Sequence, residues 1–145
     1  MAELEIDVRK ASPEDADAIA RLMVCLGYPT TTEQMRTRLE TIALDPAYGT
    51  FVAIMKGETV GMAGVCICPL YEQDNPAGRI VALCIDPNSR RSGAGTILVE
   101  HAEQWLRDRG VMVILVNSGT NRRDAHAFYG RRGYSATGVR FKKSL

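Results

Sequence analysis

The sequence lacks the marks of a membrane protein or a nucleic-acid-binding protein. No apolar run approaches the ~20 residues of a membrane-spanning helix, and the first residues have neither the basic nor the apolar region of a signal peptide. Lysines and arginines number 18 against 17 aspartates and glutamates, so the formal net charge is only +1. A broad basic surface is not indicated. We therefore expect a cytoplasmic protein with no membrane and no nucleic-acid partner.

Metal-ligating residues are also scarce. Histidine occurs twice, and of the four cysteines only Cys66 and Cys68 are close in sequence. In an extended strand their side chains would share one face, but no second cysteine pair follows, so this is a poor metal signature. We expect no bound metal and four reduced cysteines in the core.

The chain does contain enough apolar material for one hydrophobic core. It has 145 residues, of which 46% are hydrophobic and 24% are charged. This is the size and composition of one ordinary globular domain. Because no linker, repeat or low-complexity segment interrupts it, we expect residues 1–145 to form a single domain.

Hydrophobic periodicity predicts a mixed sheet with helices on both faces. Ser12 and Thr32 are the expected N-caps of the first two helices. The expected order is strand, two helices, three strands, helix, strand, helix and strand (βααβββαβαβ). The expected strands are 4–10, 50–55, 59–67, 80–85, 111–116 and 136–143, the strand 111–116 being buried on both faces, with helices in 12–27, 32–45, 96–110 and 121–132.

The stretch 90–96 lies between an apolar strand and an amphipathic helix. Backbone N–H groups without intrahelical partners point outward at a helix N-terminus, and the helix dipole adds roughly half a positive charge there. Glycines allow a ligand to approach this backbone closely, and arginines supply full charge. We therefore predict a diphosphate-binding loop made of Arg90, Arg91, Ser92, Gly93, Ala94, Gly95 and Thr96.

Two other diphosphate loops fit this stretch poorly. A P-loop needs a lysine that is absent here, and the dinucleotide fingerprint needs a third glycine where Leu98 stands. The pattern Arg90-x-x-Gly93-x-Gly95, after a strand and before a helix, instead resembles the acetyl-CoA signature Gln/Arg-x-x-Gly-x-Gly/Ala of the GNAT superfamily of N-acetyltransferases.

A second stretch is similar to another GNAT signature. Ala125-x-x-Phe128-Tyr129-x-x-x-Gly133-Tyr134 resembles Ala-x-x-Leu/Phe-Tyr-x-x-x-Gly-Phe/Tyr and lies at the expected distance downstream. Residues 140–145 also resemble the last strand of many small members, so the resemblance spans essentially the whole chain. It implies the α/β (α+β) GNAT fold, with a mixed, mostly antiparallel sheet of six to seven strands flanked by helices on both faces.

The resemblance also implies roles for individual residues. In the family, the pantetheine arm of acetyl-CoA pairs with free backbone groups of the central strand, which here are those of Leu83, Cys84 and Ile85. One of their N–H groups would polarise the thioester carbonyl. Tyr129 takes the place of the family's thiol-protonating tyrosine, and Phe128 would pack beside it.

The sequence departs from the family pattern at two places. Val81 stands where many members have a glutamate general base, so the base is unassigned; a water chain, Glu72 or Asp74 could replace it. Many members have an asparagine seven residues before the tyrosine, and this asparagine contacts pantetheine. Here Arg122 occupies that position and Asn121 lies one residue earlier, so either residue could contact the cofactor.

The expected function is transfer of an acetyl group from acetyl-CoA, as co-substrate, to a primary amine of a small molecule or protein. The alternative is a non-catalytic module of the same fold that binds CoA or acetyl-CoA as a sensor or regulator. The sequence does not identify the acceptor amine. A homodimer is expected from the family resemblance alone.

Overall fold

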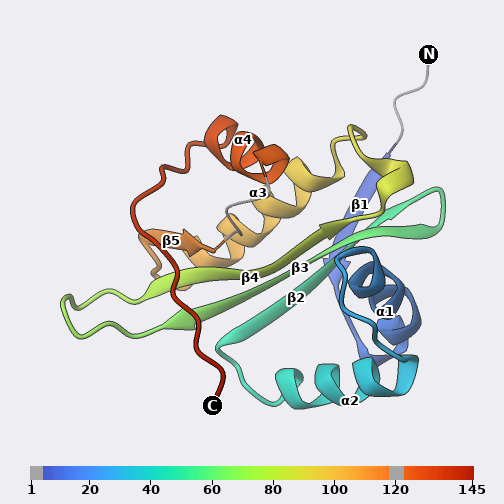
Figure 1. Ribbon diagram of the computed structural model, residues 1–145, viewed down its shortest axis with the longest axis horizontal. Helices are drawn as coiled ribbons and strands as arrows, with labels where there is room; N and C mark the ends of the chain where they lie inside the picture. Colours follow the sequence, from blue (N-terminus) through green and yellow to red (C-terminus); the bar gives the residue numbers. More distant parts are fainter. Residues whose placement is uncertain (1–4, 118–122) are drawn as a thin grey trace. The chain divides into compact units, whose positions relative to one another are not determined.

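The computed structural model describes residues 5–117 and 123–145. The chain divides into two compact units, residues 1–115 and 116–145. The elements, labelled in Figure 1, are β1 (Ile6–Lys10), the 3-10 turn η1 (Pro13–Asp15), α1 (Ala16–Cys25), α2 (Thr32–Ala43), β2 (Tyr48–Met55), β3 (Glu58–Cys68), β4 (Ala77–Ile85), the 3-10 turn η2 (Pro87–Ser89), α3 (Ala94–Arg107), β5 (Val113–Val116) and α4 (Arg123–Arg131).

One sheet organises the first unit. It has five strands in the order β1-β2-β3-β4-β5, and the first four pair antiparallel with their neighbours. β4 reaches β5 through α3, the connection typical of parallel neighbours, and their arrows point the same way in Figure 1. The sheet is therefore mixed, as the sequence predicted.

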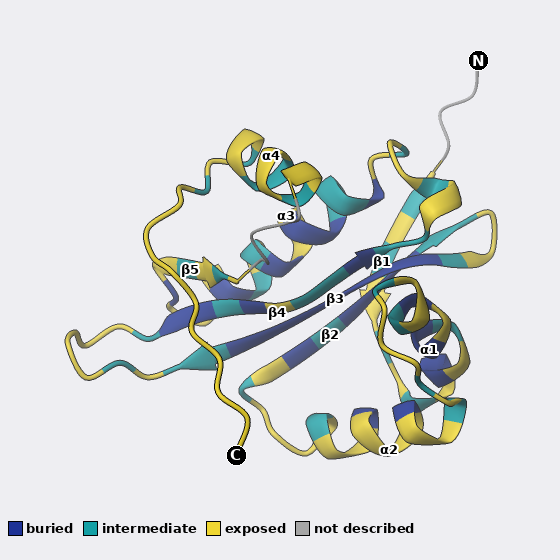
Figure 2. Cartoon of the chain, viewed as in Figure 1, coloured by how far each residue is buried: buried dark blue, intermediate teal, exposed yellow. Residues whose placement is uncertain are grey.

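Different helices cover the two faces of the sheet. On one face, α1 and α2 bury a cluster that includes Ile19 and Met35 together with Val52 of β2. On the other, Phe51 packs against His101 and Trp105 of α3, with ring centroids 4.8 and 6.1 Å apart. Neighbouring strand residues point to opposite faces, so the two clusters lie on opposite sides. Figure 2 shows this burial as the dark central strands.

Capping residues fix the starts of the first two helices. Ser12 and Asp15 form a capping box at η1, and Arg9 holds the Asp15 carboxylate with two bonds of 2.8 Å. The N-cap of α2 is Thr31 rather than the expected Thr32: its hydroxyl accepts from the Gln34 amide at 3.1 Å. The Thr31 amide in turn donates to Gln34 Oε1 at 2.9 Å, which completes a capping box and sets the boundary of the helix.

Two strand predictions are wrong. Residues 136–143 form no strand, so the sheet formed by the described residues has five strands rather than six to seven. Val139 and Phe141 are 77% and 92% exposed; the alternating pattern is present, but β-structure also needs a pairing partner and a covered face. β5 is shorter than expected and lies at the edge of the sheet, and its Val113 and Leu115 are exposed, so it is not buried on both faces.

None of the helices within residues 5–117 and 123–145 is long and apolar enough to cross a membrane.

Candidate active site

The 90–96 loop follows β4 and the short 3-10 turn η2. Asp86 caps η2 by accepting from the Asn88 amide at 2.8 Å, and the chain then turns through Arg91 and Gly93, whose φ angles are +65° and +92°. A positive φ is uncommon for a residue with a side chain, so the conformation at Arg91 needs support from the surrounding turn. The turn delivers the chain into α3, which begins at Ala94.

The N-terminus of α3 presents unsatisfied backbone amides. The first backbone bond of the helix runs from the Ile97 amide to the Gly93 carbonyl at 3.1 Å, and the Ala94 amide donates to Ser92 Oγ at 3.3 Å. The amides of Gly95 and Thr96 precede that first bond and therefore have no intrahelical acceptor. A fourteen-residue helix also concentrates its positive dipole end at this point.

The space above the loop backbone is open. A Cβ placed on Gly93 would meet no protein atom within 4 Å, so nothing in the described chain fills the place where a ligand would approach. Arg90 and Arg91 are both exposed beside it. Open backbone, free amides and two cations together fit a diphosphate. Binding of a diphosphate by residues 90–96 stays a prediction.

The β4 residues expected to hold pantetheine differ in their side-chain environments. Cys84 is buried, and its Sγ donates to the Leu22 carbonyl of α1 at 3.2 Å. Its thiol faces the core, so only its backbone could serve a ligand. Leu83 and Ile85 are half-buried and alternate with it. A backbone role for these three residues stays a prediction.

Val81 lies at a β-bulge in β4. Gly64 pairs with Ala82 and Val65 pairs with Ile80, which leaves Val81 as the extra residue. Its side chain is 54% exposed, so this central position is accessible to solvent although it carries no proton acceptor. Bulges often interrupt strand pairing next to active sites. Glu72 and Asp74, the possible substitutes for a general base, are exposed in the β3–β4 loop.

Tyr129 belongs to α4, in the second unit. Its ring lies edge-on to Phe128 and to Tyr134, with centroids 5.5 and 5.7 Å apart. All three rings are half-buried, so the phenol is held by packing within this unit. Phe128 thus lies beside Tyr129, and contact of either side chain with the cofactor stays a prediction. Asn121 and Arg122 lie outside the described residues, so the alternative between them stays a prediction.

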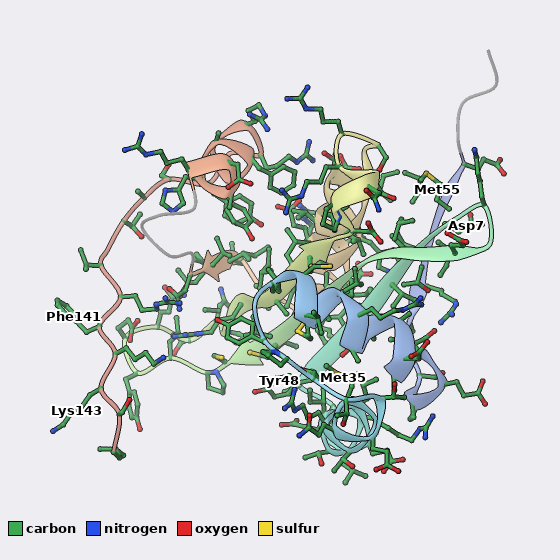
Figure 3. All side chains as sticks on the ribbon, turned by 45° about the vertical axis from the view of Figure 1, so that its right-hand side comes forward. Asp7, Met35, Tyr48, Met55, Phe141 and Lys143 are labelled. Atoms are coloured by element: carbon green, nitrogen blue, oxygen red, sulfur yellow. The ribbon has the colours of Figure 1, made fainter. Side chains whose placement is uncertain are left out.

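A polar cluster on the sheet was missed from the sequence. Strand register places Cys66 between Tyr48 and Arg79, and Cys66 Sγ lies 3.6 Å from Cys68 Sγ. Tyr48 starts β2 on the face that also carries Met35 of α2 (Figure 3). A single charged residue in the otherwise apolar run 77–85 was the available signal for Arg79. Its neighbours could not be read from the sequence, because they come from two other strands.

The cysteine predictions are corrected in one respect. All four cysteines are free thiols, with Cys66 and Cys84 buried and Cys68 half-buried, but Cys25 is exposed at the end of α1. Burial raises the pKa of the Cys66 thiol to about 11, with a further contribution from Cys68. The described part of the chain contains no group of three or more His, Cys, Asp or Glu side chains able to hold a metal ion.

The chain is similar to known acetyltransferases along most of its length. The model of the acetyltransferase (GNAT) family matches residues 16–134. Aminoalkylphosphonate N-acetyltransferase of Salmonella typhimurium is 31% identical, over 96% of this chain and 91% of that protein. Aminoglycoside N(6')-acetyltransferase type 1 of Stenotrophomonas maltophilia is 29% identical, over 90% of this chain and 86% of that protein. The solved structure of a GNAT family acetyltransferase from Staphylococcus aureus covers 98% of this chain and 100% of its own, with a TM-score of 0.83 and 27% identity.

These likenesses agree with the two signatures and with the geometry of the 90–96 loop. Both curated relatives are enzymes by name, which favours catalysis over a non-catalytic CoA-binding module. The chain belongs to the acetyltransferase (GNAT) family and is an N-acetyltransferase, transferring an acetyl group from acetyl-CoA to an amine.

Proposed function

We propose that this enzyme acetylates the primary amine of a small molecule by direct transfer, with the diphosphate of acetyl-CoA held on the 90–96 loop. The observation that carries the proposal is the open backbone at Gly93, next to the amides of Gly95 and Thr96. Arg90 and Arg91 add charge from the exposed side of the turn. An anion at this helix end gains hydrogen bonds and dipole stabilisation together.

The β4 backbone is the second part of the proposed site. Leu83, Cys84 and Ile85 follow the bulge at Val81 and are joined to the 90–96 loop through η2. A ligand lying along this strand would have its diphosphate at the helix end and its reacting end near the bulge. A β4 amide that donates to the thioester carbonyl would stabilise the oxyanion that develops during attack.

Proton transfer is assigned to Tyr129 and to solvent. The attacking amine must be neutral, and the departing thiolate gains a proton. Tyr129 is the proposed donor, supported by its place in the signature and by the two rings that hold it. Val81 cannot accept the amine proton, so we assign that proton to water at the exposed bulge rather than to a side chain of β4.

A small-molecule acceptor is favoured over a protein by the relatives. Two of the curated relatives are named for aminoalkylphosphonates and for aminoglycosides, which are both small amines. The family model spans residues of both compact units, which supports a single catalytic domain over residues 1–145. Cytoplasmic location and a homodimer stay predictions, and light scattering of the purified protein would test the second.

The experiment is release of free CoA thiol from acetyl-CoA in the presence of a panel of small primary amines. We expect amine-dependent release that saturates with at least one acceptor, together with its acetylated product. Binding of acetyl-CoA with no amine-dependent release across the panel would contradict the proposal and favour the non-catalytic module.

A further inference from the structure

We propose that Arg79 binds an anionic group of the acceptor, so that the substrate is a small amine that also carries a phosphonate, phosphate or carboxylate. This inference rests on the proposed function, because it names the acceptor class of the same site. It is carried by the position of Arg79 on the sheet and by the lack of any anionic partner for it in the described residues.

Arg79 lies on the sheet face that carries α1 and α2. Residues directly opposite each other on paired strands point to the same face, so Arg79, Cys66 and Tyr48 form a row across β4, β3 and β2. Along β3, Met62 shares the face of Cys66, and Met62 belongs to the core beneath α1 and α2. This row lies farther along the strands than Met62 and outside the buried cluster. Tyr48, at one end of the row, is exposed.

Arg79 is a cation without a counter-ion in the described chain. Its Nε is buried and has no hydrogen-bond acceptor among residues 5–117 and 123–145. The ion pairs Arg9–Asp15 and Arg21–Asp17 do not involve Arg79. Arg79 as a whole is half-buried, so its guanidinium is partly withdrawn from water, and a charged group in such a position is costly unless it is paired. A guanidinium that has no anionic partner within the protein is suited to bind a ligand that carries a carboxylate, phosphate or phosphonate.

The groups beside Arg79 do not supply the missing charge. The Cys66 thiol has a pKa of about 11 because it is buried, so it is neutral near pH 7. The nearby Cys66 and burial raise the pKa of the Tyr48 phenol above its ordinary value, so it is neutral as well. Both groups can share hydrogen bonds with a bound anion, but neither can balance a guanidinium.

The row is also close to the proposed reaction centre. Arg79 precedes the bulge residue Val81 by two positions, which is roughly 7 Å along a strand. An acceptor whose anion contacts Arg79 could therefore direct its amine toward the bulge, where we place the thioester. This distance suits an amine and an anion separated by a few bonds, so the acceptor is small.

The test compares acceptors that differ mainly in charge. 2-Aminoethylphosphonate, O-phosphoethanolamine and β-alanine carry three different anions, and 3-aminopropan-1-ol is a neutral amine of similar length. We expect the wild-type enzyme to prefer at least one anionic acceptor over the neutral one by 10-fold or more in kcat/KM. The ranking of the three identifies the anion.

Three variants separate recognition from structure. Arg79→Met should lower kcat/KM for the preferred anionic acceptor by about 10- to 100-fold, mainly through KM, because a charge-assisted contact is lost. Its activity on the neutral amine should fall much less than its activity on the preferred anionic acceptor. Arg79→Lys should restore part of the preference. Arg36→Met, at an exposed position of α2, should behave as wild type.

Calorimetry of acceptor binding to the CoA-loaded enzyme distinguishes the two proposals. If no amine is acetylated, the proposed function fails, but binding of an anionic amine that weakens in Arg79→Met would still support this inference. Equal use of neutral and anionic amines by the wild type would overturn it, as would an equal loss on both in Arg79→Met. Absence of anionic-amine binding to the wild type would also overturn it.

Discussion

Gly93→Ala should lower the stability of the fold slightly and the affinity for acetyl-CoA strongly, so the two effects can be measured separately. The φ of +92° at Gly93 costs a residue with a Cβ about 1–2 kcal/mol, and the added Cβ meets no protein atom within 4 Å. The loss should therefore come from backbone strain alone, which is small beside a typical unfolding free energy of about 5–15 kcal/mol. The melting temperature should fall by several degrees while the fold survives.

The same methyl group should affect acetyl-CoA binding much more strongly. It occupies the open space over the backbone where we place the diphosphate, so we expect the Kd for acetyl-CoA to rise at least 10-fold by calorimetry, or about 1.4 kcal/mol. Gly110→Ala is a matched control, because Gly110 has a φ of +82°, open space around it, and a place after the other end of α3. It should lose similar stability and keep its affinity. Unchanged affinity in Gly93→Ala, or an equal loss in both variants, would refute the reasoning.

Three further predictions concern other parts of the chain. Tyr129→Phe should keep acetyl-CoA affinity and lower kcat by roughly 10²-fold, the lower range for a general acid; a wild-type single-turnover rate would leave Tyr129 a packing role. Asp15→Asn should cost about 1–3 kcal/mol in urea unfolding at pH 7. Hydrogen bonds from Arg9 lower the pKa of Asp15, so that deficit should disappear as acid protonates the wild-type carboxylate, and a pH-independent deficit would contradict this. Iodoacetamide at pH 7.5 should label exposed Cys25 well before Cys66, whose pKa is about 11; mass spectrometry showing the reverse order would contradict the described burial.

The features that the sequence predicted well are those set by short stretches of chain. The 90–96 loop depends on a strand end, two glycines and a helix start, all within a few residues, and the structure has each of them. The sequence likewise predicted Ser12 as the N-cap of the first helical segment, because a capping box involves residues three apart. Local physical chemistry decides such features, so a sequence pattern is sufficient to find them.

The features that were missed depend on pairing between distant segments. The run 136–143 has a strand-like alternation, yet β-structure requires a partner strand, which the sequence could not supply. The register that places Arg79 opposite Cys66, and Cys66 opposite Tyr48, joins three strands and is invisible in a linear reading. The bulge at Val81 also arises from pairing, with Gly64 and Val65 opposite it.

A crystal structure of the protein with bound CoA tests the central claim most directly. The account predicts diphosphate oxygens within hydrogen-bonding distance, about 2.7–3.2 Å, of the amides of Gly95 and Thr96, with a guanidinium of Arg90 or Arg91 alongside. It also predicts that the pantetheine arm runs along the backbone of Leu83, Cys84 and Ile85. A diphosphate bound elsewhere, with the N-terminus of α3 facing only solvent, would contradict it.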